Sequence, residues 1–252
     1  MSIKTFLLEK GIDYQEVLLQ DEVVHKMYMV GSGTATVTSV PDGCVDLEFV
    51  KEDGKDKVYI CGSFTSGTVS PVNQYESCFG IKLNPGYVPE IVQDQAERLV
   101  DNRIEVSDDP LFRDLMNRLS ETGDFAGKVH LVRQYLGVWG LSSTRNHMAG
   151  YAMDKIRESS GHLSVAELTD NMGYSQKYVD RVFRTVIGMS MKRYAVIVRA
   201  QEAIDRVVEG REDEVYDTLG YYDQAHFIRE FKKHTLITPH KLVKNREYYS
   251  VV

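Results

Sequence analysis

Two stretches in the second half of the chain repeat one pattern, a turn followed by a short amphipathic helix. The clearer copy is GYYDQAHFIREFKK, residues 220–233. Gly220 suits a turn with positive φ, and Asp223 suits a helix N-cap because its carboxylate can accept the free amide hydrogens of the first turn. Phe227 and Phe231 share one face of the helix, while the other face carries amide, imidazole, guanidinium and ammonium groups.

The earlier copy is GYSQKYVDRVFR, residues 173–184, in which Ser175 is the expected cap. Aligning Phe183 with Phe231 places Arg181 on Arg229, at an offset of 48 residues. Two units of one pattern, separated by about fifty residues, predict a duplicated helix-turn-helix.

The segments around these helices resemble the DNA-binding domain of AraC/XylS-type transcriptional regulators. The resemblance covers residues 151–244 and rests on LSVAELTDNMGYSQKYVDRVFRTVIGMS, RAQEAI and GYYDQAHFIREFKKHTLITP. It implies an all-α domain in which a long helix, capped by Ser190, joins two helix-turn-helix units. The chain departs from the family pattern at Met191, Tyr216 and Leu236, where the family usually has proline, a small residue and glycine.

The resemblance implies that the two recognition helices enter successive major-groove segments of one DNA face, about 10–10.5 base pairs apart. The candidate base-contacting residues are Gln176, Lys177, Asp180, Arg181, Gln224, His226 and Arg229. The candidate phosphate contacts are Arg184, Lys232 and Lys233. Arg181 is expected to read guanine, because arginine can donate two hydrogen bonds to that base. The alternative is that these residues form only the solvated faces of amphipathic helices, and the repeated arginine at one offset disfavours it.

The net charge of −7 is unevenly distributed along the chain. Residues 151–252 carry 16 Lys and Arg against 15 Asp and Glu, whereas residues 1–150 carry 14 against 22. A near-neutral DNA-binding part predicts modest non-specific binding, because that binding scales with the number of phosphates neutralised. Specific affinity would then depend on local placement of Arg and Lys and on a homodimer that pairs two chains.

Residues 1–88 predict short strands and turns, which favour a small β-barrel or sandwich. In CVDLEFV, Val45, Leu47 and Phe49 alternate with Cys44, Asp46, Glu48 and Val50. PDGCVDLEFV, CGSFTSG and FGIKLNPGYVP resemble the cupin-like sensor domains that precede this DNA-binding domain in some relatives. That resemblance implies a pocket for a small-molecule effector. The strand residues expected to line it are His25, Tyr28, Phe49 and Tyr59.

Residues 90–139 have a helical pattern. Leu111, Leu115 and Leu119 form an apolar stripe after a cap at Asp108 or Asp109, and a second apolar face continues to Trp139. The stripe predicts either packing on the sheet of its own chain or a subunit contact, because periodicity does not identify the partner. Residues 140–150, GLSSTRNHMAG, predict a linker.

The three cysteines, Cys44, Cys61 and Cys78, form no CxxC motif and predict buried free thiols, with a zinc or redox sensor as the alternative. The sequence contains no nucleophile motif, phosphate loop or HExxH, so no catalytic residue, metal or cofactor is assigned. The competing hypothesis is a small-barrel enzyme or ligand-binding protein whose helical part is an interaction module.

The sequence as a whole predicts an α+β fold with a sensor domain at 1–139, a linker at 140–150 and a DNA-binding domain at 151–252. The expected function is regulation of transcription under control of a small molecule. The expected partners are double-stranded DNA, the effector, a second copy of the chain and, for an activator, RNA polymerase. The absence of an apolar run near the roughly 20 residues of a membrane helix, together with a polar N-terminus, favours a cytoplasmic protein.

Overall fold

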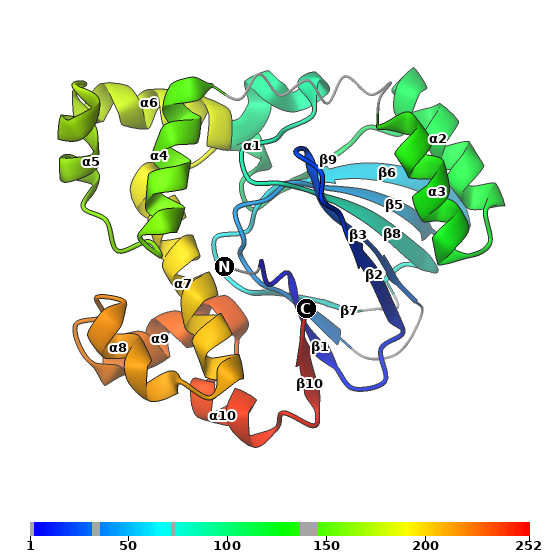
Figure 1. Cartoon of the computed structure of the whole chain (residues 1–252). Helices are drawn as coiled ribbons and strands as arrows, with labels where there is room; N and C mark the ends of the chain where they lie inside the picture. Colours follow the sequence, from blue (N-terminus) through cyan, green and yellow to red (C-terminus); the bar gives the residue numbers. More distant parts are fainter. Residues whose placement is uncertain (1–2, 32–35, 72–73, 137–145) are drawn as a thin grey trace.

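The computed structural model describes residues 3–31, 36–71, 74–136 and 146–252. Two antiparallel sheets form the N-terminal part, and helices form most of the C-terminal part (Figure 1). The predicted α+β fold class is confirmed, with a β-sandwich followed by two helix-turn-helix units.

The larger sheet has the strand order β2-β3-β8-β5-β6-β9, and the smaller has the order β10-β1-β4-β7. Every pairing between described strands is antiparallel. The strands are β1 (Phe6–Glu9), β2 (Tyr14–Leu18), β3 (Val24–Val30), β4 (Thr36–Ser39), β5 (Asp46–Glu52), β6 (Lys55–Cys61), β7 (Thr68–Pro71), β8 (Ser77–Leu83), β9 (Arg103–Glu105) and β10 (Tyr249–Val251).

Alternation along each strand gives the larger sheet two different faces. On β5, Leu47 and Phe49 belong to the main apolar core, whereas Asp46 and Glu48 line a cavity on the opposite face. The predicted alternation of this strand is therefore confirmed.

Two helices, α2 (Pro110–Glu121) and α3 (Phe125–Tyr135), cover the apolar face of the larger sheet (Figure 1). Their side chains in the main core are Phe112, Leu115, Leu119, Val129 and Val132. The side chain of Asp109 caps α2 by accepting the amide hydrogens of its first turn. Packing on the chain's own sheet thus accounts for the buried part of the predicted stripe, and a subunit contact stays a prediction.

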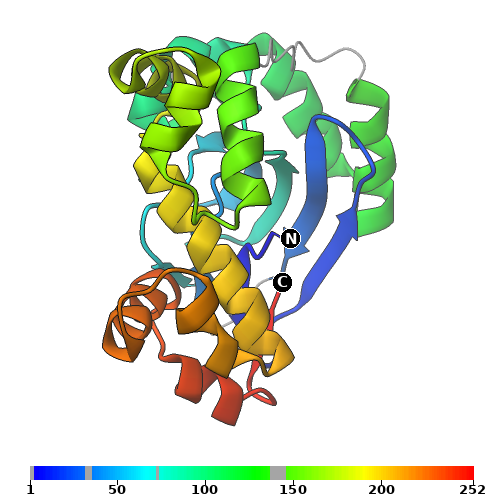
Figure 2. The same ribbon diagram turned by 60° about the vertical axis from the view of Figure 1, so that its left-hand side comes forward.

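Short helices η2 (Glu90–Gln95) and α1 (Ala96–Leu99) lie between β8 and β9 in the chain. The C-terminal helices are α4 (His147–Glu158), α5 (Val165–Met172), α6 (Gln176–Ile187), α7 (Met191–Glu209), η3 (Glu212–Glu214), α8 (Val215–Thr218), α9 (Gln224–Thr235) and α10 (Pro239–Lys244). In Figures 1 and 2, helices α5 and α6 lie at one end of α7. Helices α8 and α9 lie at its other end.

Side-chain caps explain where the C-terminal helices begin. Each capping oxygen accepts an amide hydrogen from the first turn, and the capping residues are Ser164, Ser175, Ser190, Asp223 and Thr238. Gly220 has a φ of 70°, as the sequence predicts for the turn before α9.

The structure differs from the sequence prediction in three segments. α4 begins at His147, so the last residues of the predicted linker are helical, and Asn146 caps them. β9 pairs with β6 inside the segment predicted as helical, and β10 pairs with β1 almost the whole chain length away. The predicted apolar face at Trp139 and the first residues of the predicted linker lie outside the described residues.

The two parts of the chain are in direct contact. β10 extends the smaller sheet, with Val251 opposite Leu7. Gly188, which follows α6, lies so close to α1 that a Cβ there would be 2.2 Å from the carbonyl oxygen of Ala96. Near the end of α9, the carbonyl oxygen of Lys233 accepts a hydrogen bond from the backbone N–H of Gly67, at 2.9 Å.

Candidate DNA interface and internal cavity

The helices α6 and α9 correspond residue by residue. Each has twelve residues, and the offset is 48 at both ends. Ser175 corresponds to Asp223, and both cap the helix that follows. At the other end, Gly188 and Leu236 have φ values of 81° and 64°, so the leucine adopts a left-handed conformation that glycine usually occupies.

Both helices bury an apolar face and expose a polar one. The buried residues at corresponding positions are Val179 with Phe227 and Phe183 with Phe231. The exposed candidate DNA contacts are Gln176, Lys177, Arg181, Arg184, Gln224, Arg229, Lys232 and Lys233. Amide and guanidinium groups on one surface can donate paired hydrogen bonds to base edges.

Two candidate base contacts are held by other groups of the protein. Asp180 accepts hydrogen bonds from the backbone N–H of Met191, at 2.9 Å, and from Nε of Arg184, at 2.8 Å. His226 accepts a hydrogen bond at Nδ1 from the backbone N–H of Tyr222, at 3.3 Å, and its Nε2 lies 3.8 Å from Glu230. Asp180 thus fixes the turn between α6 and α7, and His226 fixes the turn before α9.

Exposed tyrosines just before both helices were not predicted from the sequence. Tyr174 is 51% exposed and Tyr222 is 92% exposed, and the 48-residue offset aligns them. Tyr178, also exposed, lies with its ring centroid 5.4 Å from the guanidinium carbon of Arg181. The repeated GY dipeptide at residues 173–174 and 220–221 does not align at this offset, which hid the correspondence of Tyr174 with Tyr222.

A cavity of about 330 Å³ lies between the two sheets. The smaller sheet contributes Phe6 and Val37, and the larger contributes Tyr28 and Glu48. This volume lies within the range of small-molecule sites.

Buried charges lie at one side of the cavity. The ammonium group of Lys82 donates hydrogen bonds to Asp42 and Asp46, each at 2.6 Å. Burial alone would lower the pKa of Lys82, but these two carboxylates outweigh it and raise that pKa above its ordinary value. Lys82 therefore stays cationic and is paired with two carboxylates.

Tyr28 lies flat across the larger sheet because Gly80 leaves room for its ring. A Cβ on Gly80 would lie 2.0 Å from Cζ of Tyr28. The hydroxyl of Tyr28 lies 3.2 Å from Asp46 and 3.3 Å from Glu48, so it donates to carboxylates that project from β5.

The four predicted effector residues lie in different surroundings. Tyr28 lines the cavity, whereas Phe49 packs in the main core on the other face of the sheet. Tyr59 donates a hydrogen bond to Glu52 at 3.0 Å and is not part of the lining, and neither is His25. Burial, aided by Lys26 and Lys82, lowers the pKa of His25 to about 4.

The three cysteines are free and buried, in agreement with the predicted buried thiols. Burial raises the pKa of each thiol well above its ordinary value. Among the described residues, no group of three or more His, Cys, Asp or Glu side chains could hold a metal ion. Within the residues that the structure describes, no helix is long and apolar enough to span a membrane.

Comparisons with known proteins match both parts of the chain. A family model described as a helix-turn-helix domain matches residues 168–245, and one described as a domain of unknown function, DUF6597, matches residues 19–105. The chain is 26% identical over 160 residues to the uncharacterized HTH-type transcriptional regulator YisR of Bacillus subtilis, strain 168. This match covers 60% of the chain and 50% of the relative, so the chain spans half the length of that relative.

Two solved structures are also similar. ToxT from Vibrio cholerae aligns with 96% of this chain and 98% of its own, at 8% identity and a TM-score of 0.42. The C-terminal domain of AraT, a response regulator from Geobacillus stearothermophilus, aligns with 41% of this chain and 89% of its own, at 20% identity and a TM-score of 0.38.

Proposed function

We propose that this chain, which carries the double helix-turn-helix DNA-binding domain of AraC/XylS-type transcriptional regulators, regulates transcription at specific sites under control of a small molecule. The observation that carries the proposal is the correspondence between α6 and α9. Two helices of equal length expose glutamine and arginine at corresponding positions. Gln176 corresponds to Gln224, and Arg181 corresponds to Arg229.

Recognition of DNA bases is assigned to the exposed amide and guanidinium groups. Arg181 and Arg229 are exposed and suit paired contacts with guanine, and the exposed Gln176 and Gln224 suit adenine. Lys232 and Lys233, in the last turn of α9, suit phosphate contacts that set position without reading sequence. Asp180 and His226 are assigned a positioning role, since their polar atoms already have partners in the protein.

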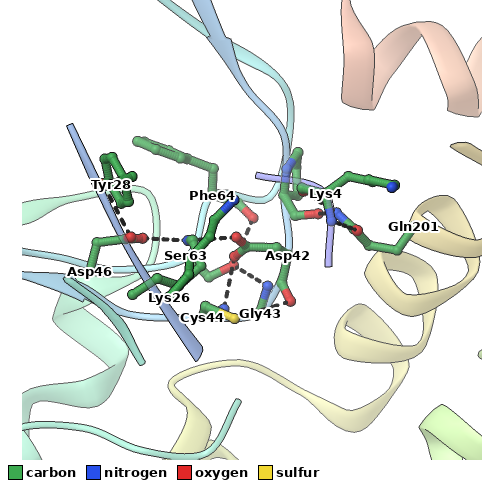
Figure 3. A network of polar contacts seen from close by, with 12 residues as sticks. Lys4, Lys26, Tyr28, Asp42, Gly43, Cys44, Asp46, Ser63, Phe64 and Gln201 are labelled. Atoms are coloured by element: carbon green, nitrogen blue, oxygen red, sulfur yellow. Dashed lines mark hydrogen bonds and ion pairs between the residues drawn. The ribbon is translucent and has the colours of Figure 1, made fainter. Parts of the chain in front are cut away.

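Control by a small molecule is supported by the contacts between cavity and helices. Asp42 lines the cavity, and the neighbouring Pro41 accepts a hydrogen bond from Gln201 on α7 at 2.7 Å. Figure 3 shows Asp42 and Gln201 in this region. Both recognition helices also end against the N-terminal part, near Ala96 and Gly67. A ligand that prefers one arrangement of these contacts would shift the orientation of both helices.

A second copy of the chain and RNA polymerase are further proposed partners. Residues 151–252 are nearly neutral, with 16 Lys and Arg against 15 Asp and Glu. A homodimer on DNA would double the phosphate contacts and raise affinity. Contact with RNA polymerase is proposed only for the case in which the protein activates transcription.

The proposal is tested by a genome-wide footprint of the tagged full-length protein in its native cell. We expect a small number of strong sites upstream of genes, each sharing one sequence motif. A footprint without a shared motif would contradict sequence-specific regulation and would favour the competing hypothesis of an enzyme with a helical interaction module.

A further inference from the structure

The interior of the cavity has more carboxyl groups than basic groups. Three carboxylates, Asp42, Asp46 and Glu48, line it together with a single ammonium group, that of Lys82. Lys82 pairs with both aspartates, so Glu48 has no cation of its own among the described residues. Its described hydrogen-bond donors are neutral, the hydroxyl of Tyr28 and the thiol of Cys61.

The remaining charged residues of the lining lie near the surface and have partners. Asp101 accepts hydrogen bonds from the backbone N–H of Thr65, at 2.6 Å, and from its hydroxyl, at 2.7 Å. Arg103 donates to the hydroxyl of Tyr75 and lies 3.9 Å from Glu52. Neither Asp101 nor Arg103 therefore pairs with the carboxyl groups in the interior of the cavity.

The surroundings of Glu48 make its charged form costly in the free protein. Burial, followed by the nearby charge of Asp46, raises the pKa of Glu48 above its ordinary value. A buried carboxylate either takes up a proton or requires a cation beside it, because a low-dielectric site penalises an isolated charge. A ligand that brings a positive charge would remove this penalty.

Aromatic rings form part of the cavity wall. Phe6 and Tyr28 meet edge to face with their centroids 5.1 Å apart, and Phe64 and Tyr75 also line the cavity. Such walls suit an apolar body, and the faces of aromatic rings attract cations.

We propose that the cavity binds a small organic cation, a protonated amine on an apolar body, with the ammonium group beside Glu48. The inference deepens the proposed function, because it names the chemical class of the effector. An organic anion would add a further negative charge beside these carboxylates, and a neutral polyol would bring no positive charge to Glu48.

The test uses thermal melting and calorimetric titration of the full-length protein with three sets of matched probes. Each set joins one apolar body to an amine, an alcohol or a carboxylate: 2-phenylethylamine with 2-phenylethanol and phenylacetate, then the butyl and cyclohexylmethyl series. Sorbitol serves as the polyol probe. We expect amines to raise the melting temperature, and the matched alcohols and carboxylates to leave it nearly unchanged.

The decisive variant is Glu48→Gln, with Glu105→Gln on the exposed strand β9 as the matched control. Loss of the charge should weaken binding of the best amine about tenfold or more, whereas the control should bind like the unmodified chain. Glu48→Asp, which keeps the charge, should recover part of the affinity. Affinity should also rise with pH, because the amine competes with the proton on Glu48. The groups that face Glu48 are Tyr28, Asp46, Cys61, Tyr75, Cys78 and Lys82.

The proposal is overturned if no amine in the panel stabilises the protein. It is also overturned if alcohols, carboxylates or sorbitol stabilise it as strongly, or if Glu48→Gln binds the amines unchanged. Sequence-specific DNA binding of the same preparation is measured alongside. Specific DNA binding without an amine response refutes only the ligand class, whereas an amine response without specific DNA binding refutes only the regulator.

Discussion

Gln201 on α7 donates a hydrogen bond to the carbonyl oxygen of Pro41, 2.7 Å away, and so connects the helix between the two helix-turn-helix units to the edge of the cavity. The same side-chain amide donates to the carbonyl oxygen of Lys4 at 2.8 Å and accepts from the Lys4 N–H at 2.7 Å. Figure 3 shows Gln201 and Lys4 beside the network of Asp42, Gly43 and Ser63. One buried side chain thus satisfies backbone groups on two segments of the N-terminal part.

Replacing this amide should destabilise the whole chain. Gln201→Leu would leave the backbone groups of Lys4 and Pro41 without partners, at a cost of about 1–3 kcal/mol in the free energy of unfolding. Urea denaturation measures the loss, and Gln134→Leu on the exposed side of α3 is the control. Equal stability of both variants would show that the connection does not hold the two parts together.

The space beneath Tyr28 gives a second prediction. Gly80→Ala would force the Tyr28 ring to move, since the new Cβ would lie 2.0 Å from Cζ, and we expect a loss of about 1–3 kcal/mol. Gly123→Ala is the control, because a Cβ at Gly123 meets no atom within 4 Å. A Gly80→Ala variant as stable as the control would contradict the position of the ring.

The two kinds of DNA contact on α9 should respond differently to substitution. Arg229→Ala should weaken specific binding by about 1–3 kcal/mol and relax preference at one base step. Lys232→Ala should weaken binding to all sequences almost equally and reduce the salt slope by about one. Both positions are exposed on one helix, so matched melting curves exclude a folding defect. Arg229 is not a base reader if its loss weakens target and scrambled DNA alike.

The pH dependence of the free energy of unfolding should reveal the raised pKa of Glu48. Because its pKa is raised in the folded state, folding takes up a proton there, and stability falls as pH rises from the ordinary glutamate range through the raised pKa. His25 has the opposite slope between its pKa of about 4 and the ordinary histidine value, so the difference between variants is the informative quantity. Relative to the unmodified chain, Glu48→Gln should gain stability as pH rises. Parallel curves for the two proteins would contradict the shifted pKa.

The sequence predicted the C-terminal helices well because their signals are local. Ser175, Ser190 and Asp223 cap helices whose first turns follow immediately in the chain. β10 could not be predicted in this way, because Val251 acquires its partner Leu7 only when the two ends of the chain meet. Three residues of alternating pattern carry too little periodicity to identify a strand.

The candidate sites likewise combine features that have a local sequence signal with features that have none. Exposure of Arg181 and Arg229 follows from helical spacing, which the sequence displays directly. The cavity depends on which strands become neighbours, so Phe49, on the core face of β5, could not be separated from lining residues such as Tyr28 by composition. The pairing of Lys82 with Asp42 joins residues forty positions apart and has no local signal.

Selection of bound sequences from a random pool of DNA by the full-length protein tests the central claim most directly. The correspondence of α6 with α9 predicts an enriched motif with two short elements whose centres lie about 10–10.5 base pairs apart. Arg229→Ala should blur one element and leave the other intact, while Arg181→Ala should do the reverse. An enriched pool without a shared motif, or a single element that both substitutions blur equally, would contradict reading of DNA by two equivalent helices.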